Sequence, residues 1–307
     1  MVAPSGEQYE ITGGGYRAVV TECGAGLRLL EYDGQQLVAG YGLDAMAPSG
    51  SGQLLLPWPN RIQDGTYTFE GTEHRLALSE PARSNASHGL TRWCSWTLEE
   101  QTEHSVSLVY RLMAQKGYPW TVDLHALYDL SADGLTVTVT ATNLSASAAP
   151  FAQGAHPYLS VGEDGIDGWE LTLPATTRVT VDDRLIPTGR SVLADTGYDF
   201  RTARPLKGIA LDTAFTDLSR GPDGRVEVSL HNPSADRGVV LWMDDRHRWV
   251  QVYTGDDLGG ERARRAVAVE PMTAPPNAFR SGEDLVVLAP AGADGDEHSS
   301  SWGIRSL

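Results

Sequence analysis

Hydrophobic and polar residues alternate with a period of two along much of the chain. Three such stretches follow one another at 96–112, 120–130 and 135–144, and in the third Val137 and Val139 fall on the same side. Successive side chains of a β-strand point to opposite faces, so this period predicts strands that bury one face. The pattern therefore predicts an all-β protein with very little helix, with short helical turns only within 196–206.

Short turn sequences separate the alternating segments. Asp33-Gly34 stands between two apolar runs, Glu70-Gly71 stands between another two, and residues 131–134 connect 120–130 to 135–144. Residues of this type accept the positive φ of a tight hairpin turn. We expect antiparallel hairpins within a single domain over residues 1–307, with a small, polar and mobile segment at 292–301.

The charge balance excludes some partners. The 307 residues include 24 Lys and Arg against 40 Asp and Glu, a formal net charge of −16, and such a surface repels nucleic acid and anionic lipid. No apolar run is long enough to cross a bilayer, and residues 1–15 lack the features of a signal peptide. With only Cys23 and Cys94, no disulfide framework can form. We expect a cytoplasmic monomer or homodimer with no nucleic-acid or membrane partner.

Two loops present polar side chains on a stiff or tightly turning backbone. Asn60 and Arg61 directly follow Pro57-Trp58-Pro59, and His88 directly precedes Gly89. A guanidinium held by a rigid loop suits the recognition of paired oxygens, and His88 could donate to a ligand hydroxyl. The alternatives are an ordinary surface arginine and a capping or core histidine.

Two more side chains stand at stiff turns beside short strands. His156 precedes Pro157 and Tyr158, and Glu270 ends an apolar strand directly before Pro271. Proline fixes the backbone, so both groups are held in defined positions. Asp212 lies between apolar neighbours and is either exposed at a strand edge or buried with a partner. The 8 histidines show no close pairing, so we expect no metal.

One histidine and one glutamate on rigid turns suit general acid–base catalysis on a small polyhydroxylated ligand. The flat faces of Trp58, Trp249 and Tyr253 would cover the apolar side of a sugar ring while charged groups hold its hydroxyls. A hydrolase would instead need two carboxylic acids, and Asp212 with Glu270 is the pairing that we consider for it.

The order and spacing of these motifs, from about residue 16 to about residue 290, resemble those of the aldose 1-epimerases, also called galactose mutarotases. The matching motifs are Asn60-Arg61 after LLLPWP, His88-Gly89, His156-Pro157-Tyr158, Asp212 in LDTAF, QVYT at 251–254, Glu270-Pro271 and PNAF at 276–279. The resemblance implies the β-supersandwich fold of that superfamily. It also implies interconversion of the α and β anomers of a hexopyranose such as glucose or galactose, without a cofactor.

The resemblance implies a role for each matching residue. His156 would protonate the ring oxygen, and Glu270 would take the proton of the anomeric hydroxyl. Arg61, His88 and Asp212 would hold other hydroxyls, with Asn60 and Tyr158 beside them in the pocket. After Tyr158 the chain reads Leu159-Ser160, where many family members have Phe-Asn, so contacts beyond Tyr158 are expected to differ.

Two other functions remain open at this stage. One is a mutarotase for an anionic sugar, a hexose 6-phosphate or a sulfonated hexose, with an extra cation supplied by Arg83, Arg92, Arg184 or Arg248. The other is a sugar-binding or sensing protein that does not catalyse. The presence of both an acid and a base argues against a mere sensor, because binding alone needs no such pair.

Overall fold

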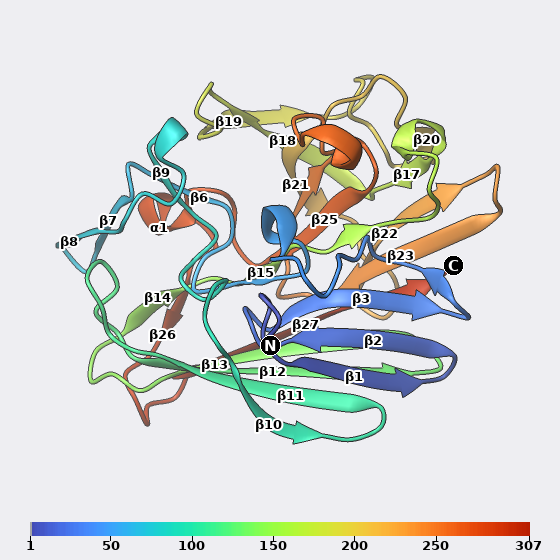
Figure 1. Ribbon diagram of the computed structural model, residues 1–307. Coiled ribbons are helices and arrows are strands. Elements are labelled where there is room, and N and C mark those ends of the chain that lie inside the picture. The colour runs from blue at the N-terminus through green and yellow to red at the C-terminus, as the bar shows by residue number, and fades with distance from the viewer. Residues whose placement is uncertain (1) are drawn as a thin grey trace.

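The computed structural model describes residues 2–307; residue 1 of the expected domain lies outside the described residues. Most of the described chain forms antiparallel β-sheet (Figure 1). Helix in it is limited to α1 (Ala278–Ser281) and to 3₁₀ turns at Pro48–Gly50, Pro81–Arg83, Ile166–Gly168 and Gly260–Arg262. The predicted all-β class with very little helix is confirmed.

The largest sheet has nine strands in the order β10-β11-β12-β13-β27-β23-β22-β17-β20. Their bounds are β10 (Thr97–Gln101), β11 (Ser105–Leu112), β12 (Val122–Ser131), β13 (Gly134–Asn143), β27 (Glu297–Ser306), β23 (Arg237–Met243), β22 (Val226–Asn232), β17 (Glu170–Thr172) and β20 (Arg204–Pro205). The three alternating stretches of the sequence supply β10 to β13, and within β13 Val137 and Val139 are buried as the pattern predicts.

A second sheet of eight strands carries most of the candidate site residues. Its order is β19-β18-β21-β24-β25-β15-β5, and β16 also pairs with β25. The bounds are β19 (Pro187–Val192), β18 (Ala175–Val181), β21 (Asp212–Leu218), β24 (Trp249–Tyr253), β25 (Val267–Met272), β15 (Gly154–Ala155), β5 (Leu54–Leu55) and β16 (Tyr158–Leu159).

Smaller sheets complete the fold. The first four strands, β1 (Gln8–Gly13), β2 (Tyr16–Thr21), β3 (Gly26–Tyr32) and β4 (Gln35–Gln36), form one sheet, and β1 and β2 lie along the largest sheet (Figure 1). The remaining pairs are β14 (Ala149–Phe151) with β26 (Val286–Leu288), β6 (Arg61–Gln63) with β9 (Asn85–Ser87), and β7 (Thr66–Phe69) with β8 (Thr72–Arg75). One buried apolar cluster draws side chains from all the larger sheets, including Ile11, Val137 and Phe215.

The predicted hairpin turns are present. Asp33 and Gly34 have φ of 47° and 75° between β3 and β4, and Glu70 and Gly71 have φ of 47° and 79° between β7 and β8. Two successive residues with positive φ are what a type I′ turn requires.

Two local predictions are wrong. The segment 196–206 contains no helix: Phe200 and Leu206 are buried in the core, and β20 pairs with β17. The segment 292–301, expected to be mobile, includes the first half of β27, which lies between β13 and β23. The hydroxyls of Ser299 and Ser301 bond those of Thr140 and Thr138 across the sheet, so small polar residues here form a cross-strand ladder rather than a loop.

Candidate active site

A polar pocket of about 220 Å³ opens over the central strands of the eight-stranded sheet, where the loops after β5 and β9 meet β21, β24 and β25. Ligand pockets for drug-sized molecules are usually larger, about 300–1,000 Å³, so this one suits a small ligand. Eight of the ten residues predicted for the site line it together: Asn60, Arg61, His88, His156, Tyr158, Asp212, Tyr253 and Glu270.

The strand register places His156 opposite Glu270. Gly154 pairs with Met272 and Tyr158 pairs with Ala268, so the His156-Pro157 turn crosses the centre of β25. Backbone bonds from Gly52 to the carbonyl of His156, and from His156 to the carbonyl of Gln53, fix the turn from its other side. The two side chains meet with 3.3 Å between Nε2 of His156 and Oε1 of Glu270.

Both members of this pair are withdrawn from water. His156 is 5% exposed and Glu270 is 2% exposed. Burial, together with the positive charges of Arg92 and Arg61, lowers the pKa of His156 to about 3. Burial and the negative charge of Asp212 raise the pKa of Glu270 well above its ordinary value, against the opposing charges of Arg61 and Arg92. Both shifts favour uncharged groups, which is a state in which the pair carries a single proton.

Several buried polar atoms at the site have no partner within the described residues. They include Nδ1 of His156, Oε2 of Glu270 and Oε1 of Gln251. Buried polar groups are nearly always hydrogen-bonded in folded proteins. Three such atoms in one pocket would suit a polar ligand or bound water.

His88 faces the same pocket as a hydrogen-bond donor. The backbone N–H of Asn60 donates to Nδ1 of His88 over 3.2 Å, and the N–H of His88 donates to the carbonyl of Asn60 over 2.8 Å. Burial, with the charge of Arg92, also lowers the pKa of His88 well below its usual value. A neutral imidazole whose Nδ1 accepts must carry its proton on Nε2. His88 can therefore donate to a hydroxyl of a ligand, as the sequence suggests.

Gly89 makes this placement of His88 possible. Its φ is +72°, and a Cβ added there would lie 2.0 Å from the carbonyl oxygen of Leu56. We expect Gly89→Ala to lower the free energy of unfolding by clearly more than the roughly 1–2 kcal/mol of the positive φ alone. Urea unfolding would measure this, with Gly71→Ala as the matched control because Gly71 has φ +79° but no atom within 4 Å of its added Cβ. Equal losses in both variants would contradict the steric explanation.

A carboxylate holds the guanidinium of Arg61 in place. Nε and Nη2 of Arg61 donate to the two oxygens of Glu80 over 2.8 and 3.2 Å, and Nη2 lies 3.8 Å from Oδ2 of Asp212. Glu80 also accepts from Arg83 and Asn85. Despite its burial, these donors, Arg61 first among them, keep the pKa of Glu80 below its usual value. The guanidinium of Arg61 is thus held in one orientation, with Nη2 facing Asp212.

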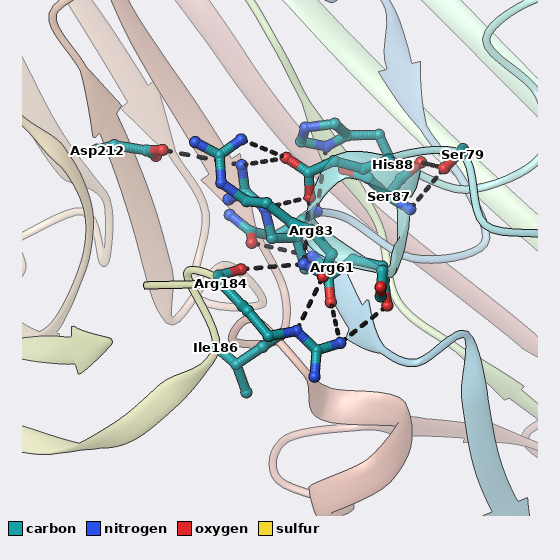
Figure 2. A network of polar contacts seen from close by, with 12 residues as sticks. Arg61, Ser79, Arg83, Ser87, His88, Arg184, Ile186 and Asp212 are labelled. Carbon is teal, nitrogen blue, oxygen red and sulfur yellow. Dashed lines mark hydrogen bonds and ion pairs between the residues drawn. The ribbon is translucent and has the colours of Figure 1, made fainter. Parts of the chain in front are cut away.

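Figure 2 shows how this network is anchored. Arg184, on the loop between β18 and β19, donates to the carbonyls of Arg83 and Ser84, and its own carbonyl accepts from Asn85. The loop that carries Glu80 is therefore tied to the eight-stranded sheet. Sequence reasoning missed Glu80, because nothing in its neighbourhood marks it as the partner of an arginine 19 residues away.

The other unforeseen residues that complete the wall of the pocket are Ser49, Gln251, Asp257 and Leu258, and Arg83, one of the cations considered from the sequence, also lines it. The amide of Gln251 donates to Asp212, and the hydroxyl of Tyr253 donates to Asp257. Asp212 therefore has a hydrogen-bond partner, which agrees with one of the two alternatives that the sequence left open. Gln251 stands in the QVYT motif and could have been found from it.

Two predicted residues lie outside the pocket. Trp58 is 2% exposed and packs on Phe279, and Trp249 is 1% exposed in a cluster with Val179, Ala214 and Met272. Their indole rings fill the interior and cannot cover a sugar ring, so their assignment to ligand binding is wrong. Tyr158, whose ring stacks on that of His156 at 5.0 Å, and Tyr253 are the aromatic side chains at the pocket.

Within residues 2–307, no group of three or more His, Cys, Asp or Glu side chains is arranged to hold a metal ion. In the same part of the chain, every helix falls short of the length and apolar character needed to span a membrane.

Comparison with solved structures defines the class of fold. The chain superimposes on the GalM/aldose epimerase homologue of Caenorhabditis elegans with a TM-score of 0.87, 20% identity and 98% coverage of both chains. It superimposes on a galactose mutarotase-like protein of Clostridium acetobutylicum with a TM-score of 0.84, 19% identity and coverage of 97% and 94%. The fold is therefore that of the galactose mutarotase-like β-supersandwich proteins, as expected from the sequence.

Sequence comparison then gives the family. The aldose 1-epimerase family matches residues 7–298, so the chain belongs to the aldose 1-epimerase family. It is 34% identical over 285 residues to the uncharacterized protein YihR of Escherichia coli, covering 92% of this chain and 89% of that protein. It is 27% identical over 226 residues to the galactose mutarotase of Sus scrofa, covering 69% of this chain and 64% of that enzyme.

Proposed function

We propose that this chain is a mutarotase that interconverts the α and β anomers of a hexopyranose by opening and reclosing its ring. The observation that carries this proposal is the buried pair of His156 and Glu270, 3.3 Å apart at the base of a small polar pocket. Such a pair can move a proton onto one oxygen of a sugar while removing a proton from another.

In the proposed reaction the pair always carries one proton. When that proton is on Nε2 of His156, it passes to the ring oxygen as ionised Glu270 takes the proton of the anomeric hydroxyl. The C1–O5 bond breaks, and the open aldehyde faces a neutral imidazole and a protonated carboxyl. Rotation about C1–C2 exposes the other face of the aldehyde. On closure Glu270 returns its proton to the carbonyl oxygen and His156 takes the proton of the C5 hydroxyl, which restores the first state.

The surrounding residues hold the rest of the sugar in this proposal. Nε2 of His88 donates to one hydroxyl, while Arg61 and Asp212 offer a donor and an acceptor on the same side. All of these side chains line one pocket. We also propose that residues 1–307 act as one domain, in keeping with the single large buried cluster. A reducing, cytoplasmic location is consistent with the free Cys23 and Cys94.

Polarimetry tests this function. Purified protein should accelerate the change in optical rotation of freshly dissolved α-D-glucose or α-D-galactose above the rate in buffer. Binding of these sugars without acceleration would instead favour a sensor. The presence of both Glu270 and His156 in hydrogen-bond range argues against a sensor, because a buried acid–base pair costs stability that binding alone does not require.

The pH dependence of the rate should change when Arg92 is substituted. A Cβ added to Gly50 would lie 3.3 Å from Nη1 of Arg92 and 3.5 Å from Cδ2 of His156, so both groups border the same small space. The cation opposes proton uptake by His156 and by Glu270. Removing it in Arg92→Met should raise the pKa of both groups, and both limbs of the profile of kcat/KM against pH should move to higher pH. Arg92→Lys keeps the charge and should leave the limbs nearly in place; unchanged limbs in Arg92→Met would contradict the account.

A further inference from the structure

The sugar pocket is built from two parts of the fold. One part is the small sheet of β6 and β9 with the loops beside it, which supplies Arg61, Glu80 and His88. The other is the eight-stranded sheet, which supplies Asp212 and Glu270. Among the described strands, β6 and β9 pair only with each other. A sugar that contacts both parts can therefore react well only if they are held in a fixed position relative to one another.

Arg184 joins the two parts. It lies in the loop between β18 and β19 of the eight-stranded sheet, and it is not among the residues that line the sugar pocket. Its Nε donates to the carbonyl of Arg83 over 2.9 Å, and its Nη2 donates to the carbonyl of Ser84 over 3.0 Å (Figure 2). Nη2 also donates to Oδ1 of Asp64, directly after β6, over 2.7 Å. Arg184, considered from the sequence as a cation for an anionic sugar, thus holds the small sheet and its loop instead.

The loop that carries Arg184 is itself firmly held. Oδ1 of Asp182 accepts from the backbone N–H groups of Arg184 and Ile186, each over 2.9 Å. An aspartate that binds its own backbone two residues on stabilises a tight turn. Ile186 is 4% exposed and packs into the interior. The guanidinium of Arg184 therefore extends from a backbone whose position is fixed by the eight-stranded sheet.

Asn85 extends this connection to the pocket. It is 0% exposed, and its Nδ2 donates to the carbonyl of Arg184 over 3.0 Å and to Oε2 of Glu80 over 3.2 Å. The backbones of Asn85 and Glu80 also bond to each other in both directions. Oε2 of Glu80 in turn accepts from Nε of Arg61 over 2.8 Å. An uninterrupted series of hydrogen bonds therefore runs from Arg184 through Asn85 and Glu80 to Arg61.

We infer that Arg184 is a positioning residue for anomer interconversion, which acts through Asn85 and Glu80 on Arg61 without touching the sugar. This inference rests on the proposed mutarotase function. In that function Arg61 donates to a sugar hydroxyl, and a good hydrogen bond of this kind needs donor and acceptor about 2.7–3.2 Å apart. Without Arg184, the loop that carries Glu80 loses the donors to two of its carbonyls, so Glu80 no longer holds Arg61 in one place.

Kinetics of Arg184→Met on the full chain test the inference. We expect kcat/KM to fall by about 10-fold, less than the roughly 10²-fold that a misplacement of about 1 Å can cost. The loss should appear mainly as a higher KM, because Arg61 holds a hydroxyl that does not react. Asp182→Ala, at an exposed residue, loosens the same loop and should cause a smaller loss of the same kind. Arg190→Met is the matched control and should keep full activity, since Arg190 lies on the same hairpin but pairs with Glu283.

A double variant separates positioning from general stability. In an Arg61→Met background, Arg184→Met should lower kcat/KM no further, because the side chain that it positions is gone. Thermal unfolding midpoints would verify that each variant is folded at the assay temperature, and Asp182→Ala decides the test if Arg184→Met is not. Losses that multiply in the double variant, or an unchanged kcat/KM in the folded single variants, would overturn the inference. A wild-type protein that accelerates neither glucose nor galactose would overturn the mutarotase function itself.

Discussion

Glu270→Gln should lower kcat for anomer interconversion by about 10²- to 10⁴-fold, the usual contribution of a general acid or base. The amide has the shape of the carboxyl group but cannot take the proton of the anomeric hydroxyl. Because Glu270 is 2% exposed and burial raises its pKa, the substitution puts a neutral group of the same shape where the surroundings already disfavour a charge. The protein should therefore fold and still bind the sugar. Polarimetry for the rate and calorimetry for binding would measure the two effects.

His156→Asn should cause a loss of similar size, and the double variant should lose little more, since the two groups act on one proton. Glu100→Gln, an exposed position on the edge strand β10, serves as a control for the loss of a carboxylate and should keep full activity. A Glu270→Gln protein that retained more than a tenth of the wild-type rate would contradict the role given to this residue.

Arg61→Met should have the second large effect, and it should appear in both activity and stability. The side chains of Arg61 and Glu80 are only 12% and 19% exposed, and the guanidinium donates twice to the carboxylate. Removing one partner of a buried pair leaves the other uncompensated, at a cost of about 3–5 kcal/mol. Because Arg83 and Asn85 still donate to Glu80, we expect the lower end of this range. Urea unfolding would measure it.

The same variant should lower kcat/KM by about 10- to 100-fold, because a charged hydrogen bond to the sugar is lost. Arg61→Lys should recover little, since an ammonium group lacks the planar fork that makes two parallel bonds to the carboxylate of Glu80. Arg111→Met is the matched control: Arg111 also makes two bonds to one carboxylate, that of Asp123, but their side chains are 58% and 40% exposed. Its loss should destabilise the protein far less than Arg61→Met and leave activity intact. Equal destabilisation in both variants would show that burial does not strengthen the Arg61–Glu80 pair.

Local pattern predicted the strands well because each strand buries one face. Val137 and Val139 alternate with threonines in the sequence and alternate between core and surface in β13. The same reasoning failed for residues 297–301. Ser299 and Ser301 bond to threonines of β13, a strand that lies far away in the sequence. A run of small polar residues therefore gave no sign of a strand in the middle of a sheet.

The site residues likewise include some that the sequence could reveal and some that it could not. His156 and Glu270 could be found because each stands beside a proline at a stiff turn, and the register of β15, β16 and β25 brings them opposite one another. Nothing in the sequence excluded Trp58 from the site, because an indole ring suits a sugar face and a hydrophobic core equally well. Glu80 and Asn85 depend on long-range contacts, with Arg61 and with Arg184, which only the folded chain reveals.

A crystal structure of Glu270→Gln with a bound hexose would test the central claim most directly. The anomeric hydroxyl should lie within hydrogen-bond distance of the side chain at position 270, with the ring oxygen facing Nε2 of His156 and other hydroxyls on His88 and Arg61. A sugar bound in this pocket with C1 turned away from position 270, or bound elsewhere on the protein, would contradict the proposed chemistry.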